Sequence, residues 1–146
     1  MLTINSARLQ QHFEAMSLIG KIGETGTCRP TLTNLEKDAF TLAASWMQEA
    51  GMKTHIDHFG NLIGRLVGTN PDLPVLMMGS HLDSQPYGGR FDGVAGVLCA
   101  IEVVKTMSEN NIRPERTIDV ISFADEEGWR FNKGLFGSRG ILGKLE

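Results

Sequence analysis

Two apolar runs on either side of one amphipathic segment constrain this fold most. Two segments, residues 74–79 (PVLMMG) and 117–124 (TIDVISFA), are typical of buried strands, because each is a short, mostly apolar run. Residues 93–108 lie between them and have the period of a helix. The buried face of that helix is predicted to comprise Val94, Val97, Leu98, Ile101 and Val104. A strand, a helix and a strand at this spacing form a crossover within one sheet, so the chain is predicted to be an α/β protein.

The remaining segments add helices and a hairpin to this unit. The sequence predicts, in chain order, a helix over 3–20, a loop over 23–32, a helix that begins at Thr33 and ends at Gly51, and two strands over 52–58 and 61–67. Thr33 followed by Glu36 is the pattern of a capping box, in which each residue satisfies a backbone amide of the other. The final stretch, GSRGILGKLE, has weak helical character, and its Ile141 and Leu142 have no later element to pack on.

Composition excludes several classes of function. The chain has 146 residues, a size typical of one domain, and a net charge of −3 gives no reason to expect nucleic acid or an anionic membrane as a partner. No apolar run approaches the ~20 residues that cross a bilayer, and the start lacks a signal pattern, so the protein is predicted to be cytosolic. Two cysteines are too few for a disulfide framework. Cys99 is predicted to be a buried hydrophobe and Cys28 a plain loop thiol.

Acidic side chains follow both apolar runs. His81 and Asp83 come directly after the first, and Asp125, Glu126 and Glu127 come directly after the second. Parallel strands of a crossover deliver the loops at their carboxyl ends to one edge of the sheet, where open α/β sheets bind ligands. Asp92 precedes the crossover helix, so it belongs to the same edge. One imidazole and several carboxylates are therefore expected to converge.

A cation would resolve the repulsion within such a cluster. Mixed imidazole and carboxylate ligands suit Zn²⁺, Mn²⁺, Co²⁺ or Ni²⁺ better than Ca²⁺. Glycines at 79, 88, 89 and 93 would let the backbone turn sharply beside an ion or substrate. On these residues alone, an ordinary loop without a metal stays open as the alternative, since acidic residues are common in solvated loops and the DEE triplet could cap a helix.

Three sequence blocks in this order resemble a known family. GSHLDSQPYGGRFDGVAGVL, SFADEEGWRF and GSRGIL, with the hairpin text FGNLIGRLVGT, resemble the amino-terminal part of the catalytic domain of the M20 metallopeptidase family. The nearest branch is that of the amidohydrolases: N-carbamoyl-L-amino-acid hydrolases, β-ureidopropionases and allantoate amidohydrolases. The resemblance runs from the first helix to the end of the chain. It implies an α/β/α sandwich with a mixed, largely parallel sheet, as in part of a zinc-peptidase-like catalytic domain.

The resemblance also implies a site with two divalent metal ions, Zn²⁺ or Mn²⁺, with Co²⁺ or Ni²⁺ as alternatives. His81 would bind one ion, Glu127 the other, and Asp92 would bridge both. Glu126 would be the general base that takes a proton from the attacking water, and Asp83 would orient His81 from behind.

The family further implies a strained Asp92–Gly93 peptide, often cis, and a small-molecule substrate with a ureido or amide carbonyl. Asp125 has no role in this pattern and is interpreted as a solvated or capping residue.

The chain departs from the family in length. Family members are several times longer, and later segments supply one further histidine to each metal and a lid domain. The 146 residues contain neither and are interpreted as the amino-terminal portion of a catalytic domain, inactive alone, that works as a homo-oligomer or with a complementing carboxyl-terminal chain. The remaining histidines do not substitute: His12 is predicted to be a surface residue, and His55 and His58 to point to opposite faces of a strand.

Two other readings remain. The first is a non-catalytic α/β domain that stands alone or self-associates and keeps residual metal binding. The second is a complete aminoacylase or peptidase of the M20 type, which the shortage of metal ligands disfavours.

Overall fold

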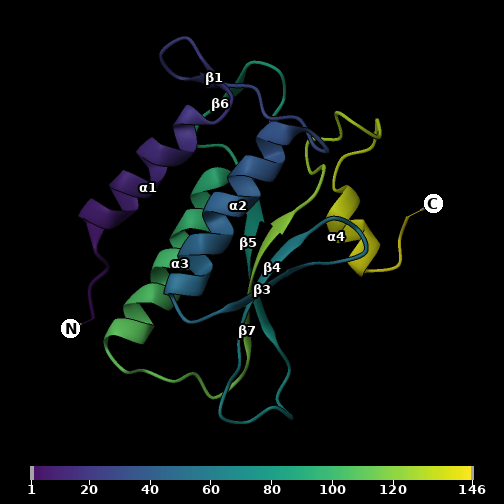
Figure 1. Cartoon of the computed structure of the whole chain (residues 1–146). Coiled ribbons are helices and arrows are strands. Elements are labelled where there is room, and N and C mark those ends of the chain that lie inside the picture. Colours follow the sequence, from purple (N-terminus) through teal and green to yellow (C-terminus); the bar gives the residue numbers. More distant parts are fainter. Residues whose placement is uncertain (1, 146) are drawn as a thin grey trace.

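The computed structural model describes residues 2–145, and its elements follow the predicted order (Figure 1). The helices are α1 (Ser6–Leu18), α2 (Asn34–Glu49), α3 (Val94–Glu109) and α4 (Phe136–Ile141). The strands are β1 (Lys21–Ile22), β2 (Gly26–Thr27), β3 (Lys53–Ile56), β4 (Leu62–Leu66), β5 (Leu76–His81), β6 (Gly88–Gly89) and β7 (Ile118–Phe123).

The main sheet has the strand order β3-β4-β7-β5. β5 and β7 are parallel neighbours joined through α3, which confirms the predicted crossover. The β3–β4 and β4–β7 pairs are antiparallel, so the sheet is mixed. Parallel pairing does not dominate in this part of the fold, because the β3–β4 hairpin contributes both antiparallel pairs. The helices α1, α2 and α3 lie on one side of the sheet and α4 on the other, which gives the expected α/β/α layers (Figure 1).

The core lies between the sheet and the helices α2 and α3. The predicted inner face of α3 is buried in full, and it packs with Met47 of α2 and Val120 of β7. Cys99, which was predicted to be buried, is exposed. The helical period explains this error, because it turns Leu98 inward and its neighbour Cys99 outward.

β5 is an edge strand and not the buried strand that its apolar sequence predicted. Leu76 and Met77 are 47% and 42% exposed, whereas Val120 and Ile121 on the central strand β7 are fully buried. Within the part of the chain that the structure describes, β7 is the only strand paired with β5. Periodicity cannot separate an edge strand from a central one when both are apolar.

The capping box at the start of α2 forms in only one direction. The Thr33 hydroxyl oxygen accepts a hydrogen bond from the Glu36 amide at 3.3 Å, as predicted. The Glu36 carboxylate, however, accepts from the Leu32 amide and the Thr31 hydroxyl, both at 2.7 Å. The predicted loop 23–32 also contains β2, which pairs with β1 and β6 in a small second sheet. Strands of two residues are too short to produce a sequence pattern.

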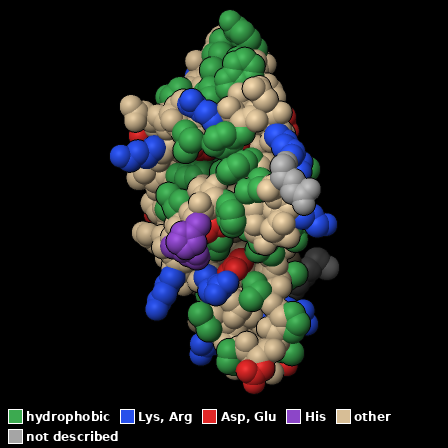
Figure 2. Space-filling model, turned by 90° about the vertical axis from the view of Figure 1, so that its right-hand side faces the viewer, with side chains coloured by type: hydrophobic (Ala, Val, Ile, Leu, Met, Phe, Trp, Pro, Cys, Tyr) green, Lys and Arg blue, Asp and Glu red, His purple; other side chains and the backbone are tan. Residues whose placement is uncertain are grey.

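The face that carries α4 retains apolar side chains on its surface. Figure 2 shows them in several groups, separated by charged residues. Leu142, which follows α4, is 66% exposed, as expected for a residue without a packing partner. Over residues 2–145, none of the helices has the length and apolar character needed to cross a membrane.

Candidate active site

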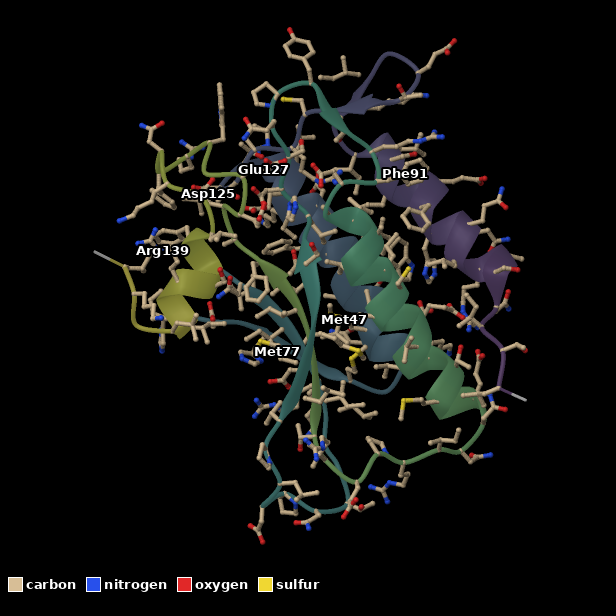
Figure 3. The ribbon with its side chains drawn as sticks, turned by 180° about the vertical axis from the view of Figure 1, so that it is seen from behind. Met47, Met77, Phe91, Asp125, Glu127 and Arg139 are labelled. Atoms are coloured by element: carbon tan, nitrogen blue, oxygen red, sulfur yellow. The ribbon has the colours of Figure 1, made fainter. Side chains whose placement is uncertain are left out.

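The site is assembled by the crossover itself. His81 ends β5 and is paired in register with Phe123, which ends β7. The acidic segment after β7 and the start of α3 therefore lie at the same edge of the sheet. Figure 3 shows Asp125 and Glu127 beyond the ends of these strands, with Phe91 beside the start of α3. Throughout, the His81 loop denotes residues 81–85, and the Glu126 loop denotes residues 124–131.

His81 is the buried centre of the site. Its Nδ1 lies 2.9 Å from the carbonyl oxygen of Asp83, and its Nε2 points toward the other side. Nε2 lies 3.3 Å from a Glu126 carboxylate oxygen and 3.9 Å from one of Asp92. The structure thus brings together three of the predicted residues, each from a different segment of the chain.

The protonation of His81 is governed by its neighbours. Burial disfavours the imidazolium, but the side chain and carbonyl of Asp83 and the charge of Glu126 outweigh it and raise the pKa of His81 to about 9. Burial also raises the pKa of the Glu126 carboxyl, which the His81 charge lowers and the nearby carboxylates raise. A metal ion and a proton would therefore compete for Nε2, because only a neutral imidazole binds metal.

Asp83 holds the two site loops together. Its side chain is buried, and its two carboxylate oxygens accept hydrogen bonds from the amides of Glu126 at 3.3 Å and Glu127 at 3.2 Å. The same carboxylate lies 3.6 Å from His81 Nδ1, so the direct contact to the imidazole comes from the Asp83 carbonyl instead. The Asp83 carbonyl thus contacts His81, and the Asp83 carboxylate fixes the backbone that carries both glutamates.

Glu127 is oriented by a residue that the sequence reasoning missed. Gln85 Nε2 donates to the Glu127 carbonyl at 2.9 Å and to its carboxylate at 3.2 Å. A glutamine between Ser84 and Pro86 carries no distinctive signal, because glutamine is ordinary in a loop. Gln85 and Asp83 together clamp the start of the Glu126 loop from the His81 loop.

Asp92 stands at the rim, where its side chain is 65% exposed. The next residue, Gly93, has φ +65°, and a Cβ added there would collide with the His81 ring. No peptide bond between residues 2 and 145 is cis, so the cis Asp92–Gly93 peptide expected from the family is absent. A trans bond is favoured by about 3 kcal/mol for residues other than proline, and the positive φ of Gly93 makes the turn without it.

Asp125 was interpreted as a solvated or capping residue, and the structure excludes the first of these two roles. It is fully buried and adopts φ +45°. Its carboxylate oxygens each accept a backbone amide at 3.0 Å, one from Arg130 and one from Phe131. Asp125 therefore folds the Glu126 loop back on itself, and the carboxylate that points into the site belongs to Glu126.

The donors match divalent metal in kind but not in number. An imidazole Nε2 beside carboxylates is the ligand type of Zn²⁺ or Mn²⁺. Among residues 2–145, however, no three histidine, cysteine, aspartate or glutamate side chains are grouped so that they could hold an ion. His55 and His58 are exposed on the hairpin, and His12 stacks on Trp46 at 3.9 Å, half-buried and not on the surface as predicted. None of the three supplies a further ligand.

Comparison with known proteins shows the family of this chain. The model of peptidase family M28 matches residues 61–144, which is more than half of the chain. The chain belongs to peptidase family M28. The motifs predicted the M20 metallopeptidases, whereas the matching family model is that of M28. The amidohydrolase branch that the motifs predicted is confirmed by the relatives.

An N-carbamoyl-L-amino-acid amidohydrolase from Pseudomonas sp. (strain NS671) is 50% identical over 99% of this chain and 35% of its own length. Allantoate deiminase 1 of Glycine max is 37% identical over 87% of this chain and 27% of its own. The crystal structure of a hydantoinase/carbamoylase family amidase from Burkholderia ambifaria matches with a TM-score of 0.95 at 39% identity, over 99% of this chain and 35% of that one. The chain spans about a third of the length of the curated relatives it matches.

Proposed function

We propose that this chain forms the amino-terminal portion of the catalytic domain of a metal-dependent amidohydrolase. Its substrate would be a small molecule with a non-peptide C–N bond, an N-carbamoyl-L-amino acid or an allantoate-type ureido compound. The observation that carries the proposal is the convergence of Glu126 and Asp92 on Nε2 of His81, at 3.3 and 3.9 Å. The names of the amidohydrolase and deiminase relatives support the substrate class.

Three of the site residues would bind metal. His81, Asp92 and Glu127 are the residues that would hold the divalent ions. When bound, such ions supply Lewis acidity for the attack of water on the carbonyl carbon. Further ligands would have to come from outside residues 2–145, because these contain no group of three that could hold an ion.

Glu126 is suited to move the proton. Its carboxylate is partly buried, with 31% of the side chain exposed, and its raised pKa brings it toward the range of a general acid and base. It would accept a proton from the attacking water and return it to the leaving nitrogen. Asp83 would keep Glu126 in place through the backbone, because its carboxylate accepts a hydrogen bond from the Glu126 amide and leaves the Glu126 side chain free to react.

A Glu126→Gln variant of the intact protein tests this role. Glutamine keeps the shape of the side chain but cannot accept the proton, so turnover of an N-carbamoyl-L-amino acid should fall by about 10²-fold or more, with Mn²⁺ content unchanged. The exposed Glu14→Gln change on α1 is the matched control and should leave turnover as it is. Equal turnover in Glu126→Gln and wild type, measured by amino-acid release, would remove Glu126 from the mechanism.

One observation favours a second candidate function. The absence of a three-ligand group within residues 2–145 fits a non-catalytic α/β domain with residual metal binding. This alternative predicts that the intact protein releases no amino acid from carbamoyl substrates at any concentration of Mn²⁺ or Zn²⁺. The same turnover assay on the wild type therefore separates the two functions.

A further inference from the structure

The short segment 29–31 lies behind both site loops, although the sequence suggested only a plain loop there. Arg29 and Thr31 are each 1% exposed, which is unusual for polar residues outside helices and strands. Pro30 separates them, so the two side chains sit on a stiff piece of backbone. Each contacts a different loop of the candidate active site.

Arg29 holds the His81 loop through side chain and backbone alike. Its Nε donates to the carbonyl of Leu82, between His81 and Asp83. Its backbone amide donates to the Ser84 hydroxyl at 2.8 Å, and its carbonyl accepts the Ser84 amide at 3.0 Å. These bonds fix the backbone on both sides of Asp83, the residue that contacts His81 and both glutamate amides.

The guanidinium also compensates buried negative charge. Its other hydrogen bonds go to main-chain carbonyls, with Nη1 donating to Ile19 at 2.7 Å. Burial lowers the pKa of Arg29 to about 10, while the charges of Asp83 and Glu36 raise it, so the group stays positive at neutral pH. The guanidinium thus places a positive charge near the buried side chain of Asp83.

Thr31 holds the Glu126 loop in the corresponding way. Its hydroxyl accepts a hydrogen bond from the Asp125 amide at 2.9 Å and donates to the Glu36 carboxylate at 2.7 Å. Its carbonyl accepts two bonds from the Arg130 guanidinium, at 3.2 and 3.1 Å. The hydroxyl therefore anchors the residue directly before Glu126.

We propose that Arg29 and Thr31 are positioning residues, which set the His81 loop and the Glu126 loop in register so that Glu126 faces Nε2 of His81. Their hydrogen bonds to the site loops go to Leu82, Ser84 and Asp125, so both residues act through the backbone beside Asp83 and Glu126. The geometric part of this proposal is independent of the reaction, whereas its effect on metal binding rests on the proposed function.

The decisive variants are Thr31→Val, which removes the hydroxyl at nearly constant volume, and Thr31→Ser, which restores it. Arg29→Met supplies the second arm. In the intact protein, hydrogen–deuterium exchange of the peptide 124–131 should become about tenfold faster in Thr31→Val and in Arg29→Met, and should return to the wild-type rate in Thr31→Ser. This readout needs no metal and no substrate.

Thr117→Val is the matched control. Thr117 is a buried threonine whose hydroxyl oxygen accepts the Gly68 amide at 3.2 Å, next to the start of β7 and so at the far end from the site. Thr117→Val loses a hydrogen bond from a backbone amide, as Thr31→Val loses the one from Asp125, and should leave exchange of 124–131 unchanged. Wild-type exchange in Thr31→Val, or equally fast exchange in Thr117→Val, would overturn the proposal.

Titration with Mn²⁺ alone provides the second readout. Thr31→Val and Arg29→Met should weaken Mn²⁺ binding about tenfold or more, the usual scale for residues behind metal ligands, and Thr117→Val should not. A wild type that binds no Mn²⁺ would contradict the proposed function, and the exchange experiment would still decide whether Arg29 and Thr31 position the loops.

Discussion

At the scale of single residues, Gly93 sets how closely α3 approaches the site. Its φ of +65° and the collision of any Cβ with the His81 ring make two separate demands on this position. Gly93→Ala should lower the free energy of unfolding by about 2 kcal/mol, measured by urea denaturation, and should weaken Mn²⁺ binding because the imidazole must move.

Gly89→Ala in β6 is the natural comparison for that change. A Cβ at Gly89 meets no atom within 4 Å and its φ is not positive, so the unfolding free energy should stay within about 0.5 kcal/mol of wild type. If both alanine variants were equally stable and bound Mn²⁺ equally well, Gly93 would have no special role beside His81.

Site residues were predictable where the motif and the strand ends coincide. His81, Asp92 and Glu126 meet because β5 and β7 are parallel neighbours, which the apolar runs already indicated. Asp83 was the one supporting residue that the motif indicated. The role of Asp125 was not predictable, since it looks like any loop acid until its carboxylate accepts two backbone amides. Such contacts depend on the loop path, which single-residue chemistry does not determine.

At the scale of elements, an ion-pair cluster fastens α1 to α3. Arg8 donates to Glu102 from Nε and Nη2, both at 2.8 Å, and to Glu109. Glu102 is 1% exposed and also accepts the Asn5 amide. Although burial alone would raise the pKa of Glu102, the Arg8 bond, the Asn5 amide and Thr106 lower it below its usual value.

This cluster predicts a particular pH dependence of stability. A carboxylate with a lowered folded pKa stabilises the fold above its unfolded pKa of about 4.3, and that contribution is lost as the pH falls through the folded pKa. Glu102→Gln should therefore cost about 2 kcal/mol at pH 7, and the difference from wild type should shrink in denaturation experiments below pH 4. Glu109→Gln, on the exposed side, should cost far less; a pH-independent difference for Glu102→Gln would contradict this account.

The elements themselves follow from periodicity, but the edge or central position of a strand does not. The crossover helix α3 and the β3–β4 hairpin form close to the predicted residues, since apolar period and turn chemistry are local signals. The exposure of β5 was missed because its apolar side chains suit a central strand equally well. Whether a strand lies at the edge or in the centre of the sheet depends on long-range pairing, which the local sequence does not encode.

At the scale of the whole molecule, the number of possible metal ligands matters more than their chemical type. The edge of the sheet brings an imidazole within 3.3 and 3.9 Å of two carboxylates, yet residues 2–145 contain no group of three that could hold an ion. The relatives named as amidohydrolases are about three times as long, as their 35% coverage shows. Under the proposed function, further metal donors would have to come from beyond these residues.

A polypeptide restricted to residues 1–146 should therefore fail to hydrolyse N-carbamoyl-L-amino acids, with Mn²⁺ or Zn²⁺ added in excess. Two donors per ion leave the metal largely hydrated and weakly bound, so neither the acidity of water nor the position of the carbonyl is controlled. Amino-acid release and metal titration on that polypeptide test both parts of the expectation. Turnover within tenfold of a full-length relative would mean that His81, Asp92, Glu126 and Glu127 suffice, and that a second copy of the chain or a rearranged Glu126 loop completes the coordination.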